Sequence, residues 1–110
     1  MPTKLATVND RITTMLDEIE AGRHPGRAAV EEMLTDGYAW ALSLDGECTR
    51  LERRISDKAV ELSEGSGEEP ALELSALASL LSRRRAQLAE LRSLLATLRD
   101  GVREPEPNAA

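Results

Sequence analysis

The sequence predicts an all-α protein whose centre is a long, coiled-coil-like antiparallel helical hairpin, with a shorter N-terminal helix packed on one end. Three observations lead to this fold class. Leu, Ala, Glu and Arg dominate the chain, and these residues have high helix propensities. Apolar residues recur in alternating steps of three and four, which is the spacing of one helix face. β-branched residues never alternate with polar ones over a useful run, so strands are not expected.

The core must be built almost without aromatic rings, because the 110 residues include one Trp, one Tyr and no Phe. Leu, Ala, Val, Ile and Met then supply the interior, and this composition suits helix-on-helix packing. A chain of this length fits one domain, which we place at residues 1–102. Residues 103–110 contain two prolines and no apolar pattern, and we expect a disordered tail there.

The charge and hydropathy of the chain argue against two classes of partner. A formal net charge of −6 gives no positive surplus for the phosphates of nucleic acid or for an anionic membrane surface. The apolar stretches are too short to span a bilayer, and residues 1–20 lack the apolar run of a secretory signal. The single cysteine cannot form an internal disulfide, which favours a reducing, cytoplasmic setting.

Gly- and Pro-containing links divide the chain into three helical segments, at about residues 3–20, 27–63 and 71–100. The second and third segments each carry a heptad seam, which is typical of coiled-coil packing. The seam of the second segment consists of Val30, Leu34, Gly37, Ala41, Leu44, Cys48, Leu51, Ile55, Lys58 and Leu62. The seam of the third consists of Leu74, Leu77, Leu81, Arg84, Leu88, Leu91, Leu95, Leu98 and Val102, and Gly101 is expected to end this helix.

The short link between the second and third segments makes them antiparallel neighbours. Residues that face each other then have numbers that sum to about 136, which brings the two seams together along their length. Among the seam residues, this pairing places Gly37 opposite Leu98.

Two Asp-Gly dipeptides in the second segment oppose a continuous helix. Each Gly costs about 1 kcal/mol relative to Ala inside a helix. Gly37 lies on the seam, where a missing side chain lets the backbones approach. Gly46 lies outside the seam, so a kink or break near Asp45-Gly46 stays open as an alternative.

The first segment is long enough to cover only one half of the hairpin. That half becomes a three-helix bundle, with Tyr38, Trp40 and Leu94 as expected filler beneath the first helix. The other half is a bare two-helix hairpin, which buries little apolar surface. We therefore expect a homodimer or docking onto another helical protein. The candidate interface residues are Ile55, Leu72, Leu77 and Leu80.

Six arginines form the one cluster that has the chemistry of a ligand site. The predicted pairing places Arg53 opposite Arg83 and Glu52 opposite Arg84, so the guanidinium groups gather near one level of the hairpin. Grouped guanidiniums suit a phosphate or carboxylate ligand. The alternative is a set of surface ion pairs with neighbouring Glu and Asp residues. The candidate anion-binding residues are Arg50, Arg53, Arg54, Arg83, Arg84 and Arg85.

The run Arg83-Arg84-Arg85 in a Leu-rich antiparallel hairpin resembles the actinobacterial anti-sigma factors that hold a cyclic dinucleotide across two helices. The repeated Glu, Ser, Arg, Gln, Asp spacing of those proteins is not present. Around Ser82 and Arg85, the positions of the Glu and the Gln hold Ala78 and Ala89, and Leu80 takes the place of the Ser that would precede Arg83 and Gln87. The resemblance implies a cyclic dinucleotide as one alternative ligand and does not assign the family.

No set of residues in the sequence has the composition of a catalytic or metal site. His24 is the only histidine, and no nucleophile lies near it in the sequence. Cys48 lies on the seam and is expected to act as a small core residue. We therefore expect no enzyme and no cofactor. The expected function is that of a non-enzymatic, self-associating interaction or regulatory module. The alternative is a sensor of an anion or nucleotide, or an anti-sigma-like regulator, that uses the arginine cluster.

Overall fold

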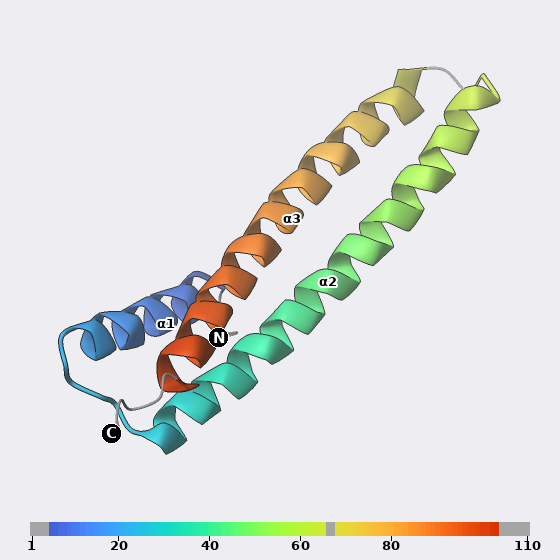
Figure 1. The fold of residues 1–110 in the computed structure, drawn as a ribbon. Coiled ribbons are helices and arrows are strands. Elements are labelled where there is room, and N and C mark those ends of the chain that lie inside the picture. The colour runs from blue at the N-terminus through green and yellow to red at the C-terminus, as the bar shows by residue number, and fades with distance from the viewer. Residues whose placement is uncertain (1–4, 66–67, 104–110) are drawn as a thin grey trace. The chain divides into compact units, whose positions relative to one another are not determined.

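Three helices make up the fold, which is described for residues 5–65 and 68–103 of a computed structural model, without the side chains of residues 102 and 103 (Figure 1). Helix α1 spans Leu5–Glu20, α2 spans Arg27–Ser63 and α3 spans Glu68–Arg103. The described residues contain no strand, and α2 and α3 pack against each other. The all-α fold class predicted from the sequence is confirmed.

Glycines with positive φ angles end the first two helices. Beyond α1, Gly22 has a φ of 87°, its N–H donates to the Ile19 carbonyl, and the N–H of Arg23 donates to the Glu18 carbonyl at 2.8 Å. These two bonds form a Schellman motif. Beyond α2, Gly65 has a φ of 79° and donates to the Leu62 carbonyl at 3.0 Å. The left-handed conformation that glycine adopts without strain thus fixes where both helices stop.

The predicted bounds of the third helix were too narrow at both ends. Helix α3 begins at Glu68, since two acidic side chains in its first turn complement the helix dipole. Pro70 also lies in that turn, where a missing N–H costs no hydrogen bond. Gly101 lies inside the helix because it does not adopt the positive φ that a C-terminal stop requires. Of the tail expected at 103–110, Arg103 belongs to α3, and residues 104–110 lie outside the described residues.

Helix α2 is continuous through Asp45-Gly46, so the break that the dipeptide suggested does not occur. The neighbour nearest to a Cβ at Gly46 is Arg50 Nη1, at 3.5 Å. No tertiary contact therefore explains this glycine.

The chain divides into two compact units, and α2 and α3 run through both. Unit 1 contains residues 1–41 and 90–110, and unit 2 contains residues 42–89. In unit 1, α1 packs with the beginning of α2 and the end of α3 around a closed core. The side chains with less than 2 % of their surface exposed are Val8, Ile12, Val30, Met33, Leu91, Leu95 and Leu98. All of them belong to unit 1.

Unit 1 also shows which predicted packing details were wrong. Gly37 faces Leu95 instead of Leu98: a Cβ at Gly37 would overlap Leu95 Cδ2 and lie 3.3 Å from its Cγ. Tyr38 is not filler, because it is 43 % exposed and its hydroxyl accepts a 3.4 Å hydrogen bond from Arg99 Nη1. Met33, which lies outside the predicted seam, is buried. A helix packed between two neighbours buries a wider stripe than a two-helix seam.

Unit 2 is a two-helix hairpin with a thin core. Its core cluster consists of Cys48, Leu51, Leu77 and Leu81, with Ile55 and Leu80 packed against it and partly buried. The four core side chains keep 5 to 8 % of their surface exposed. The predicted seam is therefore buried at Cys48, Leu51, Leu77 and Leu81, whereas Leu62, at its link end, was wrongly placed in it and is 37 % exposed.

Candidate functional site

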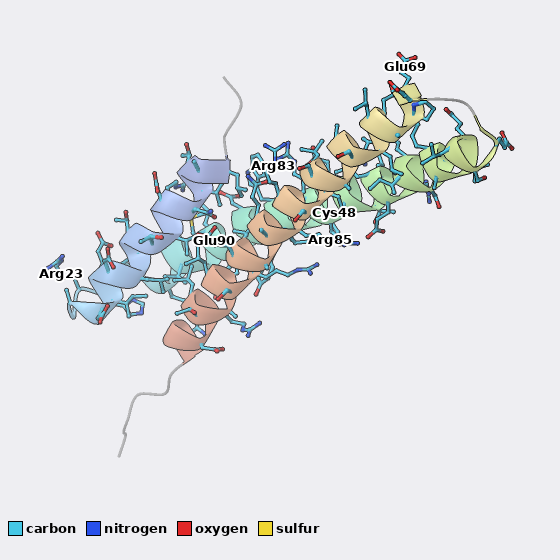
Figure 2. The ribbon with its side chains drawn as sticks, turned by 90° about the horizontal axis from the view of Figure 1, so that it is seen from above. Arg23, Cys48, Glu69, Arg83, Arg85 and Glu90 are labelled. Atoms are coloured by element: carbon cyan, nitrogen blue, oxygen red, sulfur yellow. The ribbon has the colours of Figure 1, made fainter. Side chains whose placement is uncertain are left out.

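The predicted arginine cluster lies in unit 2, and the helix geometry divides it between two sides of the hairpin. Arg83 and Arg85 are two positions apart on α3, so their side chains leave the helix in nearly opposite directions. Figure 2 shows them on opposite sides of α3. The six guanidinium groups do not form one belt.

Arg84 lies at the seam and is half-buried. Its Nε donates to Glu47 Oε1 at 3.1 Å and its Nη1 donates to Gln87 Oε1 at 3.2 Å. The Arg84 side chain is 30 % exposed and the Glu47 side chain 44 % exposed. Glu47, and not the predicted Glu52, is therefore the partner of Arg84 across the hairpin.

Arg85 forms an ion pair with Glu52 on the other flank of the hairpin. The residue numbers of this pair sum to 137, whereas those of Glu47 and Arg84 sum to 131. Because long side chains reach along the partner helix, an ion pair on one flank can depart from the predicted sum of 136 by several residues.

Two other arginines line a shallow hollow on the flank opposite Arg85. The hollow has a volume of about 270 Å³ and is lined by Glu47, Arg50, Leu51, Arg54 and Leu80. Arg83 follows Leu80 by three positions, which places the two on the same side of α3. We call Arg50, Arg54 and Arg83, together with this hollow, the arginine face. Arg53 is exposed and does not line the hollow.

The arginine face combines guanidinium donors with apolar side chains. Two arginines separated by one helical turn, Arg50 and Arg54, can bind the two oxygens of a carboxylate or a phosphate. Leu51 and Leu80, which also line the hollow, can accept an apolar group beside that anion. The surface therefore suits an acidic partner that also carries an apolar side chain.

At the link end of unit 2, a lysine forms ion pairs with glutamates of both helices. Lys58 Nζ lies 2.5 Å from Glu73 Oε1 on α3 and 3.4 Å from Glu61 Oε1 on α2. The hydrogen bond to Glu73 is the main cause that raises the pKa of Lys58 above 10.5, and the negative charges of Glu61 and Glu73 act in the same direction. Lys58, which belongs to the predicted seam, thus joins the two helices by an ion pair.

The four candidate interface residues differ in exposure. Leu77 belongs to the core and is 8 % exposed, so little of it remains for a partner. Ile55 and Leu80 are partly buried against the core. Leu72 is 69 % exposed. The residues that a second layer would cover are therefore Leu72 and the outer surface of Leu80.

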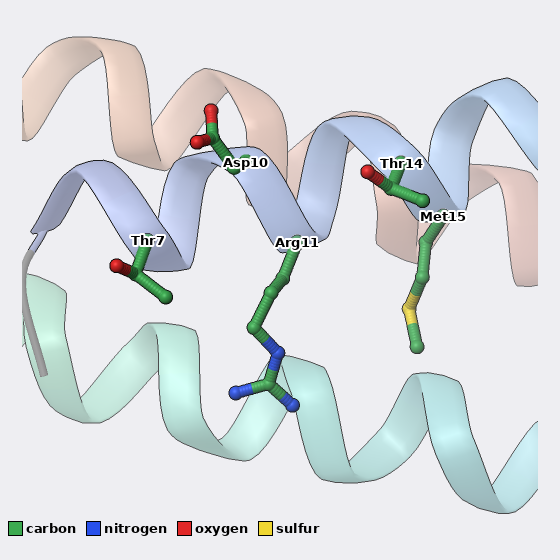
Figure 3. A pocket seen from close by; sticks show the side chains of 5 residues that line it. All are labelled: Thr7, Asp10, Arg11, Thr14 and Met15. Carbon is green, nitrogen blue, oxygen red and sulfur yellow. The ribbon is translucent and has the colours of Figure 1, made fainter.

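Two hollows in unit 1 were not predicted from the sequence. One, of about 350 Å³, lies along a single stripe of α1 (Figure 3) and is lined by Thr7, Asp10, Arg11, Thr14 and Met15. The other, of about 260 Å³, is lined by Val8, Arg11, Asp36, Ala39 and Trp40. The spacing of the α1 residues along one helix face can be read from the sequence. Neither set of lining residues contains a nucleophile paired with a base.

The remaining chemically notable residues have structural surroundings. His24 Nδ1 accepts a 3.0 Å hydrogen bond from the N–H of Gly26 in the link before α2. Cys48 is a free thiol in the core of unit 2. Within the part of the chain that the structure describes, no three His, Cys, Asp or Glu residues are grouped as metal ligands would be. None of the described helices combines the length and apolarity needed to cross a membrane.

Comparison of the chain with protein-family models, with curated proteins and with solved structures gave no match.

Proposed function

We propose that the chain is a non-enzymatic helical interaction module that self-associates through unit 2. The observation that carries this proposal is the difference in burial between the two units. Unit 1 has seven side chains with less than 2 % of their surface exposed, whereas every core side chain of unit 2 keeps 5 to 8 % exposed. A two-helix unit lacks the second layer that would exclude water from such a core.

Exposed apolar side chains point to the same unit. Four of the five large hydrophobic residues that are exposed in the described chain belong to unit 2: Leu42, Val60, Leu62 and Leu72, with exposed fractions of 73, 55, 37 and 69 %. Removing apolar surface from water contributes about 25 cal/mol per Å². Association that covers Leu72 and the edge of the hairpin core would therefore stabilise unit 2.

The test is the association constant of variants at two equally exposed leucines, measured by sedimentation equilibrium. Leu72→Asp should weaken the dimer at least tenfold, which corresponds to roughly 1.4 kcal/mol. Leu42→Asp is the matched control, because Leu42 is exposed to a similar extent but points away from the arginine face on α2. Circular dichroism should show unchanged helicity for both. A wild-type chain that stays monomeric up to its solubility limit would reject the proposal.

A sensor of a small anion is the second candidate function, and the hollow beside Arg50 and Arg54 supports it. Two observations weigh against it. Glu47 contributes a carboxylate to the same hollow, and Arg84 and Arg85 are already paired with carboxylates. Calorimetric titration with inorganic phosphate and with a cyclic dinucleotide tests this alternative. Heat of binding that disappears in Arg54→Ala would support it, and the absence of any heat would remove it.

A further inference from the structure

We infer that two copies associate antiparallel, so that the acidic link end of unit 2 in each copy lies on the arginine face of the other. This inference rests on the proposed self-association and adds its geometry and its charge contacts. It commits to a second copy of this chain as the occupant of the arginine face.

Charge is segregated along unit 2. Around the link between α2 and α3, five glutamates, at positions 61, 64, 68, 69 and 73, are accompanied by one cation, Lys58. Farther from the link, Arg50, Arg53 and Arg54 on α2 and three consecutive arginines on α3 outnumber the acidic residues at positions 45, 47 and 52. A surface with both signs separated along its length complements itself when a second copy lies on it in the opposite direction.

One stripe of α3 has a residue spacing that is symmetric about its central residue, with opposite charges at its two ends. It consists of Glu69, Leu72, Ala76, Leu80 and Arg83, in steps of three, four, four and three. These steps keep the five residues on one side of the helix. Leu80 is half-buried and the other four are exposed. Figure 2 shows Glu69 and Arg83 on the same side of α3, with Arg85 on the opposite side.

A two-fold axis at Ala76 pairs this stripe with itself. In an antiparallel pair of α3 helices, Glu69 meets the second copy's Arg83, and Leu72 meets the second copy's Leu80. Each contact occurs twice, and Ala76 lies at the crossing, where a small side chain lets the two helices approach. Leu72, which is 69 % exposed, then enters the hollow that Leu80 lines.

Helix α2 has the same separation of positive and negative charges along the same flank of the hairpin. Arg50 and Arg54 lie away from the link, and Asp57 and Glu61 lie toward it, in steps of four, three and four. The ion pairs between α2 and α3 in unit 2 (Lys58–Glu73, Glu47–Arg84 and Glu52–Arg85) place Ala76 of α3 at a level between residues 55 and 61 of α2, with residue 58 midway. Arg54 and Glu61 lie on either side of that level by similar distances. One two-fold axis therefore pairs α2 with α2 and α3 with α3.

The charged ends of the α3 stripe have no ion-pair partner within residues 5–65 and 68–103: neither Glu69 nor Arg83 takes part in a salt bridge there. Exposed ion pairs contribute little affinity one at a time, but like charges brought into the same positions oppose binding. The charges of this stripe therefore set the orientation and register of the dimer, while the leucines supply most of its affinity.

The test is charge reversal with complementation. Arg83→Glu alone and Glu69→Arg alone each place like charges opposite one another at two points, so each variant should dimerise at least tenfold more weakly than the wild type. In an equimolar mixture of the two variants both contacts are of opposite sign again, and a heterodimer should form with near wild-type affinity. Arg53→Glu, an exposed arginine outside the stripe, is the control and should dimerise normally.

A crosslink provides a second readout at the proposed axis. Mild oxidation of Ala76→Cys should give a disulfide-linked dimer, whereas Ala78→Cys, on the other side of α3, should not. If the wild type dimerises but the charge variants are unaffected and Ala76→Cys does not crosslink, the antiparallel arrangement is wrong while self-association stands. If the wild type itself is monomeric, the proposed function fails together with this arrangement.

Discussion

At Gly37 the lack of a side chain allows α2 and α3 to pack closely within unit 1. The sequence predicted a close approach at this residue because it interrupts an otherwise apolar seam. It did not predict the neighbour, since a coiled-coil register derived from residue numbers is uncertain by one helical turn. The structure places Leu95 there, with no exposed surface and therefore little room to move.

Gly37→Ala should destabilise the protein despite the better helix propensity of alanine. The new Cβ would overlap Leu95 Cδ2, and such overpacking typically costs about 1–3 kcal/mol, against a gain of about 1 kcal/mol in propensity. We expect a net loss of about 1 kcal/mol in the free energy of unfolding, measured by urea denaturation. Gly46→Ala is the control and should stabilise, because only the end of Arg50 lies near it. A stabilised Gly37→Ala variant would contradict this packing.

Arg84 shows how a polar residue is accommodated on an apolar seam. Its guanidinium donates to Glu47 and Gln87, and the side chain as a whole is only 30 % exposed. The sequence identified Arg84 as exceptional because leucines occupy most neighbouring seam positions. It did not identify the partner, because the spacing of the residues allows Arg84 to reach either Glu47 or Glu52.

Arg84→Leu should leave stability unchanged or raise it, because the leucine continues the apolar seam and Glu47 stays hydrated. The ion pair is partly exposed, and such pairs contribute about 0–1 kcal/mol. Arg84→Ala removes the stem packing as well as the pair and should lose about 1 kcal/mol. Thermal unfolding of both variants distinguishes these effects. If the leucine variant is the less stable of the two, the ion pair matters more than the packing.

At the scale of the helices, the sequence predicted the three helices, their order and most of their bounds. The bounds of α2 agree with the structure because Gly26 precedes it and Gly65 ends it, both with positive φ. The bounds of α3 were harder to predict, because Pro70 and Gly101 are helix-breaking residues by type but occupy positions that a helix tolerates. The residue type does not fix the conformation of a glycine, and Gly101 lacks the positive φ with which Gly22 and Gly65 end the other two helices.

Because Lys58 links α2 to α3, the free energy of unfolding should fall as the pH becomes alkaline. The pKa of Lys58 is raised in the folded chain, so its contribution is fully present below pH 10.5 and is lost as the pH rises through the folded pKa. Lys58→Met should therefore melt at a lower temperature than the wild type at neutral pH. The difference should shrink above pH 10.5. A difference that is constant over this range would show that the charge of Lys58 is not what stabilises the link.

At the scale of the whole chain, the sequence predicted an uneven distribution of apolar packing, and the structure has it. The first helix is too short to cover both halves of the hairpin, so unit 1 has a closed core and unit 2 does not. The sequence predicted the six arginines as one cluster because they are close in residue number along the hairpin. Consecutive residues on a helix point in different directions, and the structure accordingly separates Arg83 from Arg85 (Figure 2). Only the smaller arginine face remains as a candidate surface.

Self-association through unit 2 is the central claim of this account, and the absolute mass in solution tests it most directly. Light scattering should be recorded over a wide concentration series of the complete chain. We predict that the mass rises with concentration from 12.0 kDa toward twice that value, and that added salt shifts the transition to higher concentration by screening the charge contacts. A mass that stays at 12.0 kDa at every concentration would contradict the claim.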